Sequence, residues 1–333
     1  MNAAAPRVIA RYWEKRPDGG AACHLCPHHC IVKPGKTGIC MAKTNEGGEL
    51  IANTYGLTTS LNLDPMEKKP LYHFHPGTEI LSVGPNACNF GCRFCQNFQI
   101  SQQSAPTRYL SPEDLVRAAK ESGSVGVAYT YTEPLMWYEY LLDACRAVKE
   151  AGMVNVLVSN GHLQPEPYDE LLPLIDALNI DIKSMNETFY RHICKGWLPP
   201  VLRNVSATAG KAHIEITNLV IPTLNDADAD IEKLARFIAS VDPFMPLHFS
   251  RYYPMYKMDL PATPVETLVR AARIAKQHLK YVFIGNAQVD EFSNSLCPFC
   301  GHLLIERAGY TVSVTGVKKG HCLSCGEAVK IVG

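Results

Sequence analysis

Three cysteines on a single short loop could bind an iron–sulfur cluster. Cys88, Cys92 and Cys95 follow one another at spacings of four and three residues, directly after the apolar run 80–84, which is typical of a buried strand. Three thiolates can bind three irons of a cubane 4Fe-4S cluster and leave the fourth iron open to an outside ligand. A closed structural site would normally take four protein ligands. The spacing therefore favours a cluster with an open iron over a zinc knuckle or three unrelated thiols.

A second group of cysteines lies near the N-terminus. Proline and glycine residues occupy its longest gap, so the segment could fold around a metal with little core of its own. We expect a structural zinc site, with a second iron–sulfur cluster as the alternative, because four thiolates suit a closed site. His28 or His29 could replace one of the thiolates. The cysteines of this group are Cys23, Cys26, Cys30 and Cys40.

Two CxxC pairs, each followed by glycine, lie near the C-terminus and are separated by a stretch rich in β-forming residues. This pattern is typical of a zinc ribbon, in which glycine allows a tight turn whose amides point at the sulfurs. So short a segment needs a metal or another cross-link in order to fold. The predicted zinc ligands are Cys297, Cys300, Cys322 and Cys325.

The composition is that of a globular cytoplasmic protein. Hydrophobic residues make up 47% of the 333 residues, and 32 basic residues balance 32 acidic ones. This balance gives no electrostatic reason to expect a nucleic acid or an anionic membrane as partner. The chain start lacks a signal-peptide core, and no apolar run is long enough to span a membrane. In a reducing cytoplasm the cysteines are expected to be metal ligands or buried thiols rather than disulfides.

Strand-like and helix-like patterns alternate through the central part of the chain. Ser111-Pro112 and Glu133-Pro134 mark helix starts. Such alternation implies parallel strands in an α/β fold, either an open barrel or a doubly wound sheet. In both folds the reactive groups lie at the C-terminal ends of the strands. The predicted strands are 80–84, 124–131, 154–158, 177–183, 213–221 and 247–250, with further helices at 228–241 and 264–279.

These patterns divide the chain into three segments. Residues 1–75 form a cysteine-rich knuckle and a connecting loop, residues 76–290 form the α/β domain, and residues 291–333 form the ribbon segment. Prolines and charges predict an irregular connection over residues 64–77, in which lysine and histidine side chains are usually solvated or hydrogen bonded.

Polar side chains stand at several of the predicted strand ends. Asp181 and Lys183 alternate around one residue, so both face one side of their strand, and two inward charges favour cofactor binding. Glu133 could accept hydrogen bonds from an ammonium group or simply interact with a helix dipole. His248 could contact a cofactor or be a hydrogen-bonded barrel histidine. Ser159-Asn160 ends the third strand, and no residue is singled out as catalytic.

The cysteine loop resembles the CxxxCxxC signature of the radical S-adenosylmethionine (SAM) superfamily, including Phe94 before the third cysteine and Gln96-Asn97 after it. The resemblance implies a partial (β/α)6 TIM-like barrel of the radical SAM type, which we prefer to a doubly wound sheet. It also implies a 4Fe-4S cluster whose open iron binds the amino and carboxylate groups of SAM. Reductive cleavage of SAM then yields methionine and a 5'-deoxyadenosyl radical, which abstracts hydrogen from the substrate.

The strand-end residues are similar to the polar positions that glycyl-radical-enzyme activases use around SAM. Glu133 matches the acid of a glycine-glycine-glutamate motif that holds the SAM amine, although Tyr131 and Thr132 replace the two glycines. Val158 stands where the activases carry an aspartate, which puts an adjacent cation site in doubt. The resemblance implies SAM contacts from Glu133, Ser159, Asn160, Asp181, Lys183 and His248.

Nearly end to end, the chain resembles the radical SAM component of the AmmeMemoRadiSam system, whose members are often labelled pyruvate formate-lyase activating enzyme homologues. The resemblance implies Memo-like and associated proteins as partners, and radical SAM chemistry implies a reductant such as flavodoxin or ferredoxin. The motifs that carry it, besides the cysteine loop and the ribbon, are Cys23-x-x-Cys26-Pro-His, Asp64-Pro-Met-Glu-Lys-Lys-Pro, Thr130-Tyr-x-Glu-Pro, Leu219-Val-Ile-Pro-x-Leu-Asn-Asp and Pro246-Leu-His-Phe-Ser-Arg.

The function expected from these features is hydrogen abstraction from a protein or peptide substrate, with the glycine Cα of the activases as the model for the hydrogen donor. The same radical acting on a small metabolite or nucleotide is the alternative. A non-enzymatic scaffold held together by metals is a third class, against which the intact Cys88, Cys92, Cys95 and Glu133 argue.

Overall fold

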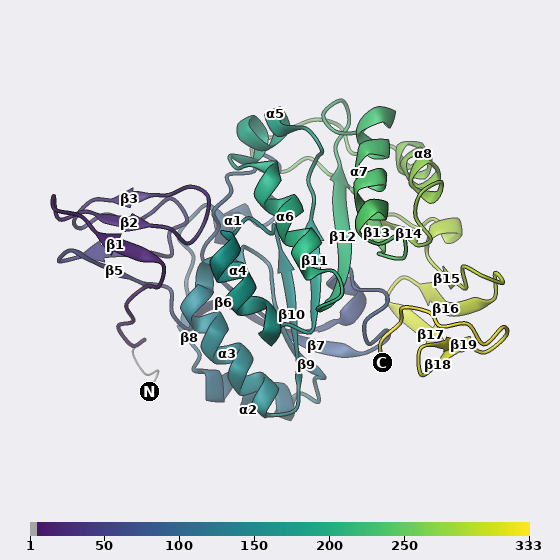
Figure 1. The fold of residues 1–333 in the computed structure, drawn as a ribbon, viewed down its shortest axis with the longest axis horizontal. Coiled ribbons are helices and arrows are strands. Elements are labelled where there is room, and N and C mark those ends of the chain that lie inside the picture. The colour runs from purple at the N-terminus through teal and green to yellow at the C-terminus, as the bar shows by residue number, and fades with distance from the viewer. Residues whose placement is uncertain (1–4) are drawn as a thin grey trace.

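The computed structural model describes residues 5–333, and its centre is a nine-stranded sheet (Figure 1). Neighbouring strands follow the order β14-β13-β12-β11-β10-β9-β7-β6-β8, so the sheet has two edges and does not close into a full barrel. The parallel strands are β7 (Glu79–Pro85), β9 (Gly126–Tyr129), β10 (Val154–Ser159), β11 (Ala177–Asp181), β12 (His213–Val220), β13 (Leu247–Arg251) and β14 (Val282–Gly285).

All six predicted strands are present as β7 and β9 to β13, but the sheet is larger than predicted. A seventh parallel strand, β14, pairs with β13. On the other side, β6 (Leu57–Pro65) pairs antiparallel with β7 and with β8 (Arg108–Tyr109). The sheet is therefore mixed, and residues 57–65 belong to it although they precede the predicted segment boundary at residue 76.

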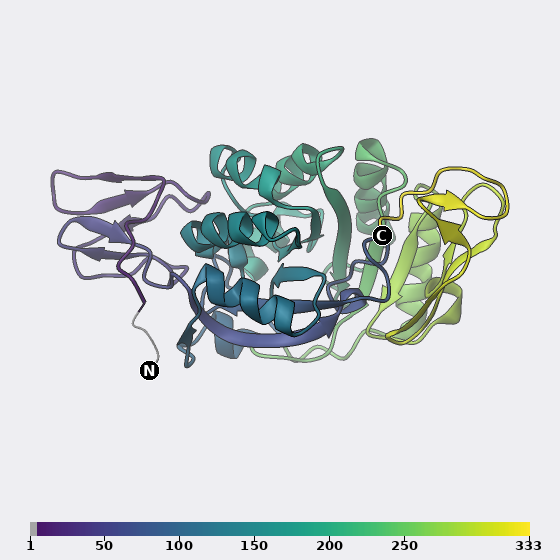
Figure 2. The ribbon, with the colours of Figure 1, turned by 90° about the horizontal axis from the view of Figure 1, so that it is seen from below.

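The helices lie along one face of this sheet (Figures 1 and 2). A doubly wound sheet would carry helices on both faces, so this arrangement is that of a partial barrel. Ser111 begins α2 as predicted, because its hydroxyl accepts a hydrogen bond from the Asp114 amide at 3.1 Å. The helices are α1 (Phe98–Ser101), α2 (Pro112–Glu121), α3 (Tyr138–Glu150), α4 (Pro165–Leu171), α5 (Glu187–Phe189), α6 (Leu198–Thr208), α7 (Asp228–Val241) and α8 (Val265–Lys276).

Small β-sheets flank the main sheet at both ends of the chain (Figure 2). The N-terminal strands are β1 (Trp13–Lys15), β2 (Ala21–Cys23), β3 (Ile31–Val32), β4 (Thr44–Glu46) and β5 (Glu49–Ile51). The C-terminal strands are β15 (Ser295–Leu296), β16 (Leu303–Ala308), β17 (Thr311–Val314), β18 (Val317–Lys318) and β19 (His321–Cys322). Within residues 5–333, no helix has the length and apolar character that crossing a membrane requires.

A buried ion pair at the end of β6 is also hydrogen bonded to the loop after β9. The Lys69 ammonium lies 2.6 Å from Asp64 Oδ2 and is 2% exposed, so of the two states expected for this lysine it is the hydrogen-bonded one. Lys68 binds Asp64 Oδ1 at 2.8 Å, and the Tyr131 hydroxyl donates to Oδ2 at 2.6 Å. Burial alone would raise the pKa of Asp64, but these hydrogen bonds outweigh it and hold the pKa well below its usual range.

We predict that Asp64→Asn lowers the free energy of unfolding by about 3 kcal/mol at pH 7, because it leaves the Lys69 ammonium buried without its counter-charge. A carboxyl with a lowered pKa in the folded protein stabilises it above the unfolded pKa, and this contribution is lost as pH falls. The difference between the variant and the wild type should therefore shrink below about pH 4. Denaturant unfolding across pH measures it, with exposed Asp259→Asn as control. A constant difference down to low pH would contradict this assignment.

Candidate functional site

The loop with Cys88, Cys92 and Cys95 follows the C-terminal end of β7, and all three cysteines are free thiols. The Phe90 amide donates to Cys88 Sγ at 3.4 Å, and Cys95 Sγ lies 3.1 Å from the Ser101 hydroxyl. Burial raises the pKa of Cys88 well above its usual value. Buried thiols of this kind become thiolates when a metal binds, because a coordinating thiol is deprotonated.

A segment after β11 supports the cysteine loop from outside. The Gly91 amide donates to the Cys194 carbonyl at 2.8 Å, and the Arg93 amide donates to the Ile193 carbonyl at 3.1 Å. Both carbonyls belong to the last two residues of η4 (Tyr190–Cys194), a single π-helical turn. The side chain of Cys194 also bonds to Cys92 and lowers the pKa of that thiol. Cys194 is therefore a direct neighbour of a predicted metal ligand.

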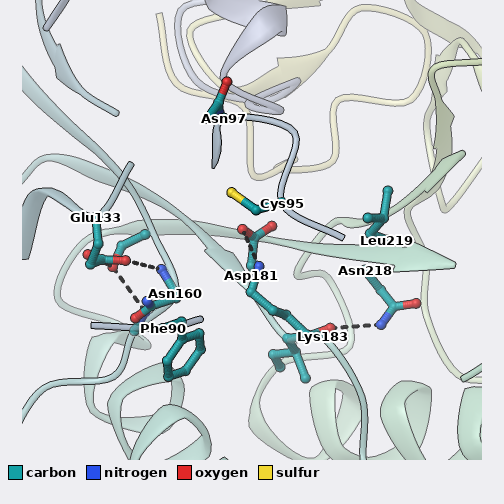
Figure 3. A network of polar contacts seen from close by, with 12 residues as sticks. Phe90, Cys95, Asn97, Glu133, Asn160, Asp181, Lys183, Asn218 and Leu219 are labelled. Carbon is teal, nitrogen blue, oxygen red and sulfur yellow. Dashed lines mark hydrogen bonds and ion pairs between the residues drawn. The ribbon is translucent and has the colours of Figure 1, made fainter. Parts of the chain in front are cut away.

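Glu133 is fully buried and holds two neighbouring strand ends together (Figure 3). Its Oε1 accepts hydrogen bonds from the Leu135 amide at 3.0 Å and the Ser159 hydroxyl at 2.8 Å. Its Oε2 accepts the Asn160 amide at 2.8 Å. Burial raises the pKa of Glu133 to about 7, even though these donors favour the carboxylate. The structure thus brings Glu133, Ser159 and Asn160 into direct contact.

Asn160 connects this carboxylate to the cysteine loop. Its side-chain amide donates to Asn89 Oδ1 at 2.9 Å, and Asn89 lies between Cys88 and Cys92. Asn89 in turn donates to the His162 carbonyl at 2.8 Å. The carboxylate, the end of β10 and the cysteine loop therefore form one hydrogen-bonded unit.

Asp181 and Lys183 form an ion pair, with Lys183 Nζ 3.1 Å from Asp181 Oδ2 (Figure 3). The Lys183 charge favours the ionised forms of both Glu133 and Cys92 and so lowers the pKa of each group. Asp181, Thr217 and His248 are register partners on adjacent strands, so they lie in one row across the sheet. The ion pair is consistent with the prediction that Asp181 and Lys183 face the same side of the strand.

His248 belongs to a different hydrogen-bonded network from that of Glu133. Its Nε2 lies 2.6 Å from Oε2 of Glu215, a buried carboxylate whose Oε1 accepts the His73 amide at 2.7 Å and contacts His213 at 2.9 Å. Burial alone would raise the pKa of Glu215, but its bonds to His213 and His248 outweigh burial and hold it well below its usual range. These contacts fit the hydrogen-bonded barrel histidine, and a SAM contact by His248 stays a prediction.

Sequence reasoning missed several residues of this region: Asn89, His162, Cys194 and Glu215. Glu215 carried a usable signal, since it is a charged residue within an apolar strand, as Asp181 is. Asn89 lies inside the cysteine loop and could have been suspected for that reason. Cys194 gave no signal, because its contact with Cys92 joins positions that are far apart in the chain.

The two terminal cysteine groups differ in geometry. The sulfurs of Cys297, Cys300, Cys322 and Cys325 all lie within 4.8 Å of one another and could hold one metal ion. Opposite pairs are 3.7 and 3.8 Å apart. The N-terminal group, Cys23, Cys26, Cys30 and Cys40, lines one small cavity instead. His28 and His29, considered as replacement ligands, hydrogen bond to Asn89 and Gln164.

Comparison with known proteins shows which sequences are similar to this chain. The Radical SAM superfamily matches residues 83–238. An uncharacterized protein of Methanocaldococcus jannaschii is 42% identical over 332 residues, covering 97% of this chain and 99% of that protein. The pyruvate formate-lyase-activating enzyme of Clostridium pasteurianum is 27% identical over 164 residues, covering 46% of this chain and 67% of that enzyme.

The fold is also similar to a solved structure. The crystal structure of a radical SAM methyltransferase from Sphaerobacter thermophilus aligns with a TM-score of 0.51 at 18% identity, over 69% of this chain and 71% of that chain. This likeness concerns the fold alone. The superfamily match includes the loop with Cys88, Cys92 and Cys95, together with Glu133 and the strand ends that it joins. Residues 83–238 of the chain therefore belong to the radical SAM superfamily.

Proposed function

We propose that the chain cleaves SAM reductively and uses the resulting radical to abstract a hydrogen atom from a substrate. One observation carries this proposal: the loop after β7, which carries three free thiols, is hydrogen bonded through Asn89 and Asn160 to the buried carboxylate of Glu133. A cluster site and an acceptor for an ammonium group are thereby joined at the C-terminal ends of parallel strands, where α/β proteins carry their reactive groups.

The three loop cysteines fit a 4Fe-4S cluster with an open iron. They supply three thiolates, and amide and hydroxyl groups already lie at hydrogen-bond distance from two of the sulfurs. When bound, the cluster and SAM supply a 5'-deoxyadenosyl radical and methionine. The chain itself positions the reactants and excludes water, because Cys92, Glu133 and Asn160 are buried.

We assign the SAM contacts to the residues that the sequence indicates. Glu133 would accept the SAM ammonium group, and the charge of that group would favour the carboxylate form despite burial. Ser159 and Asn160 already orient the Glu133 oxygens. The Asp181–Lys183 pair would contact the polar parts of SAM, with His248 at the level of Asp181 two strands away.

For the substrate we propose a protein or peptide, with a glycine Cα as the hydrogen donor. The support is the similarity to an activating enzyme for pyruvate formate-lyase and the resemblance to the AmmeMemoRadiSam family. A one-electron reductant such as flavodoxin or ferredoxin would supply the electron, and Memo-like proteins are proposed partners on the same resemblance.

A small anionic metabolite is the second candidate, and one cavity favours it. A cavity of about 410 Å³ lies between the sheet and the C-terminal segment, and this volume is within the range of small-molecule sites. Thr217 and His248 line it from the sheet, Lys68 from the loop after β6, and Arg307 from β16. Three cationic or ionisable donors around one cavity would suit carboxylate or phosphate groups.

At the C-terminal group we propose zinc. Metal–sulfur bonds of about 2.3 Å in a tetrahedral site place the sulfurs about 3.8 Å apart. The measured separations of 3.7 and 3.8 Å match this value. We therefore assign one mononuclear site to Cys297, Cys300, Cys322 and Cys325, and zinc is the usual ion for four thiolates.

Glu133→Gln should weaken SAM binding about tenfold to a hundredfold, because the ammonium group loses a charged acceptor. The amide keeps the shape of the side chain, so iron content should not change. Equilibrium binding of SAM to anaerobically reconstituted protein measures the effect. Glu113→Gln, at the exposed start of α2, is the matched control and should bind as the wild type does. Equal affinity in all three proteins would refute the assignment of Glu133.

Cys322→Ser should remove one equivalent of zinc and loosen the C-terminal segment. A segment this small depends on its metal, so amide hydrogen exchange should accelerate over residues 295–333 and stay slow in the main sheet. Metal analysis and peptide-resolved exchange give both readouts, with Cys145→Ser, a buried cysteine of α3, as control. Iron with acid-labile sulfide at this site, or unchanged zinc in the variant, would argue against the zinc assignment.

A further inference from the structure

The N-terminal cysteines surround one enclosed cavity with sulfur ligands only. Cys23, Cys26 and Cys40 are buried, Cys30 is partly exposed, and Leu25, Val32 and Met136 complete the apolar wall. The nearby histidines are used elsewhere: His28 Nε2 lies 2.8 Å from the Asn89 carbonyl, and His29 Nε2 lies 2.6 Å from the Gln164 amide nitrogen. The cysteine sulfurs are therefore the metal-binding atoms that this cavity offers.

The spacing of these sulfurs differs from that of a single-ion site. Within residues 5–333, groups of three or more metal-binding side chains with all ligand atoms within 4.8 Å of one another occur only at the C-terminal cysteines. The N-terminal sulfurs are spread more widely around their cavity, as are those of Cys88, Cys92 and Cys95. One tetrahedral ion needs sulfurs about 3.8 Å apart, whereas a cluster binds each thiolate through a different iron and so accommodates a wider set.

A buried cation stands beside the same cavity. Lys43 lines it, is 1% exposed, and forms an ion pair with Glu139. Glu139 also accepts the Arg11 amide at 2.8 Å, so its charge is shared with a second donor. A cluster with four thiolate ligands carries net negative charge, and a neighbouring ammonium group offsets part of the cost of burying it.

The N-terminal group is joined directly to the proposed radical site. The Cys88 amide donates to the Cys40 carbonyl at 3.2 Å, so one hydrogen bond connects a cysteine of each group. The bond between His28 and the Asn89 carbonyl is a second contact between the two segments. The backbone of Cys40 thus lies beside the inner site, while Cys30 is the partly exposed cysteine of the group.

We propose that Cys23, Cys26, Cys30 and Cys40 bind an iron–sulfur cluster that relays single electrons to the cluster at Cys88, Cys92 and Cys95. A one-electron protein reductant is oxidised at the Cys30 end while the N-terminal cluster is reduced. The electron then passes by way of Cys40 to the inner cluster, so the N-terminal cluster is reoxidised while the inner one is reduced. No bond forms or breaks. The metal assignment stands on the N-terminal geometry alone, and only the relay rests on the proposed cleavage of SAM. The geometry thus favours the iron–sulfur cluster, which was the alternative from the sequence, over the zinc site that the sequence led us to expect.

The first test removes the inner site. The triple variant Cys88→Ala, Cys92→Ala, Cys95→Ala, reconstituted anaerobically with iron and sulfide, should keep stoichiometric acid-labile sulfide and an electron paramagnetic resonance signal on reduction. Adding Cys23→Ala and Cys26→Ala should abolish both. Zinc contains no sulfide, so a triple variant that binds one further zinc and no sulfide would overturn the metal assignment, whether or not the wild type cleaves SAM.

The second test addresses the relay. In Cys30→Ala, the inner cluster should be reduced at least tenfold more slowly by reduced ferredoxin, while dithionite, a small reductant, should still reduce it fully. Stopped-flow absorbance measures both, and Cys145→Ala is the control for thiol loss in the core. Iron content and melting temperature verify that the inner site is intact, and Cys26→Ala is the second variant if Cys30→Ala fails this check. An unchanged rate with ferredoxin would overturn the relay.

Discussion

The cysteine loop depends on backbone hydrogen bonds from segments on both sides of it. The loop has little regular structure of its own, yet it must hold three sulfurs in place beside Glu133. The Cys88 amide bonds to the Cys40 carbonyl, and the amides of Gly91 and Arg93 bond to carbonyls of η4. These contacts give three loop amides backbone partners and so fix the path of the loop. Both the N-terminal segment and the connection after β11 are therefore parts of the site.

Burial and the surrounding donors shift the pKa of Glu133 in opposite directions. Desolvation raises the pKa of this carboxyl to about 7, while three donors and Lys183 favour its charged form. A carboxylate balanced in this way is well suited to accept an ammonium group, because the incoming charge replaces the missing solvation. The hydrogen bonds to Ser159 and Asn160 fix the oxygens before any ligand arrives, which lowers the entropy cost of binding.

The sequence was most informative where a local pattern determines the structure. Periodicity located β7 and the strands from β9 to β13, and the Ser111 cap located the start of α2. It omitted β14, a four-residue apolar run that alone cannot be told from a helix segment. It also omitted β6, whose polar residues resemble a loop and whose strand identity comes from its pairing with β7.

Long-range contacts set the limit of prediction at the site. Residue type and position at strand ends singled out Glu133, Ser159 and Asn160, and the structure brings them together. Spacing could not show that Cys194 touches Cys92 or that His248 binds Glu215, since each pair forms only when distant segments pack. The number of cysteines likewise could not separate the compact C-terminal group from the wider N-terminal one.

The most direct test of the central claim is the formation of 5'-deoxyadenosine and methionine from SAM by the anaerobically reconstituted and reduced protein. Cys92→Ala provides the matched control, because it removes one ligand of the proposed open-iron cluster and leaves both terminal cysteine groups intact. We predict that the wild type forms both products and that the variant forms neither. Products from the variant at the wild-type rate, or none from a wild type loaded with cluster, reductant and candidate substrates, would contradict the claim.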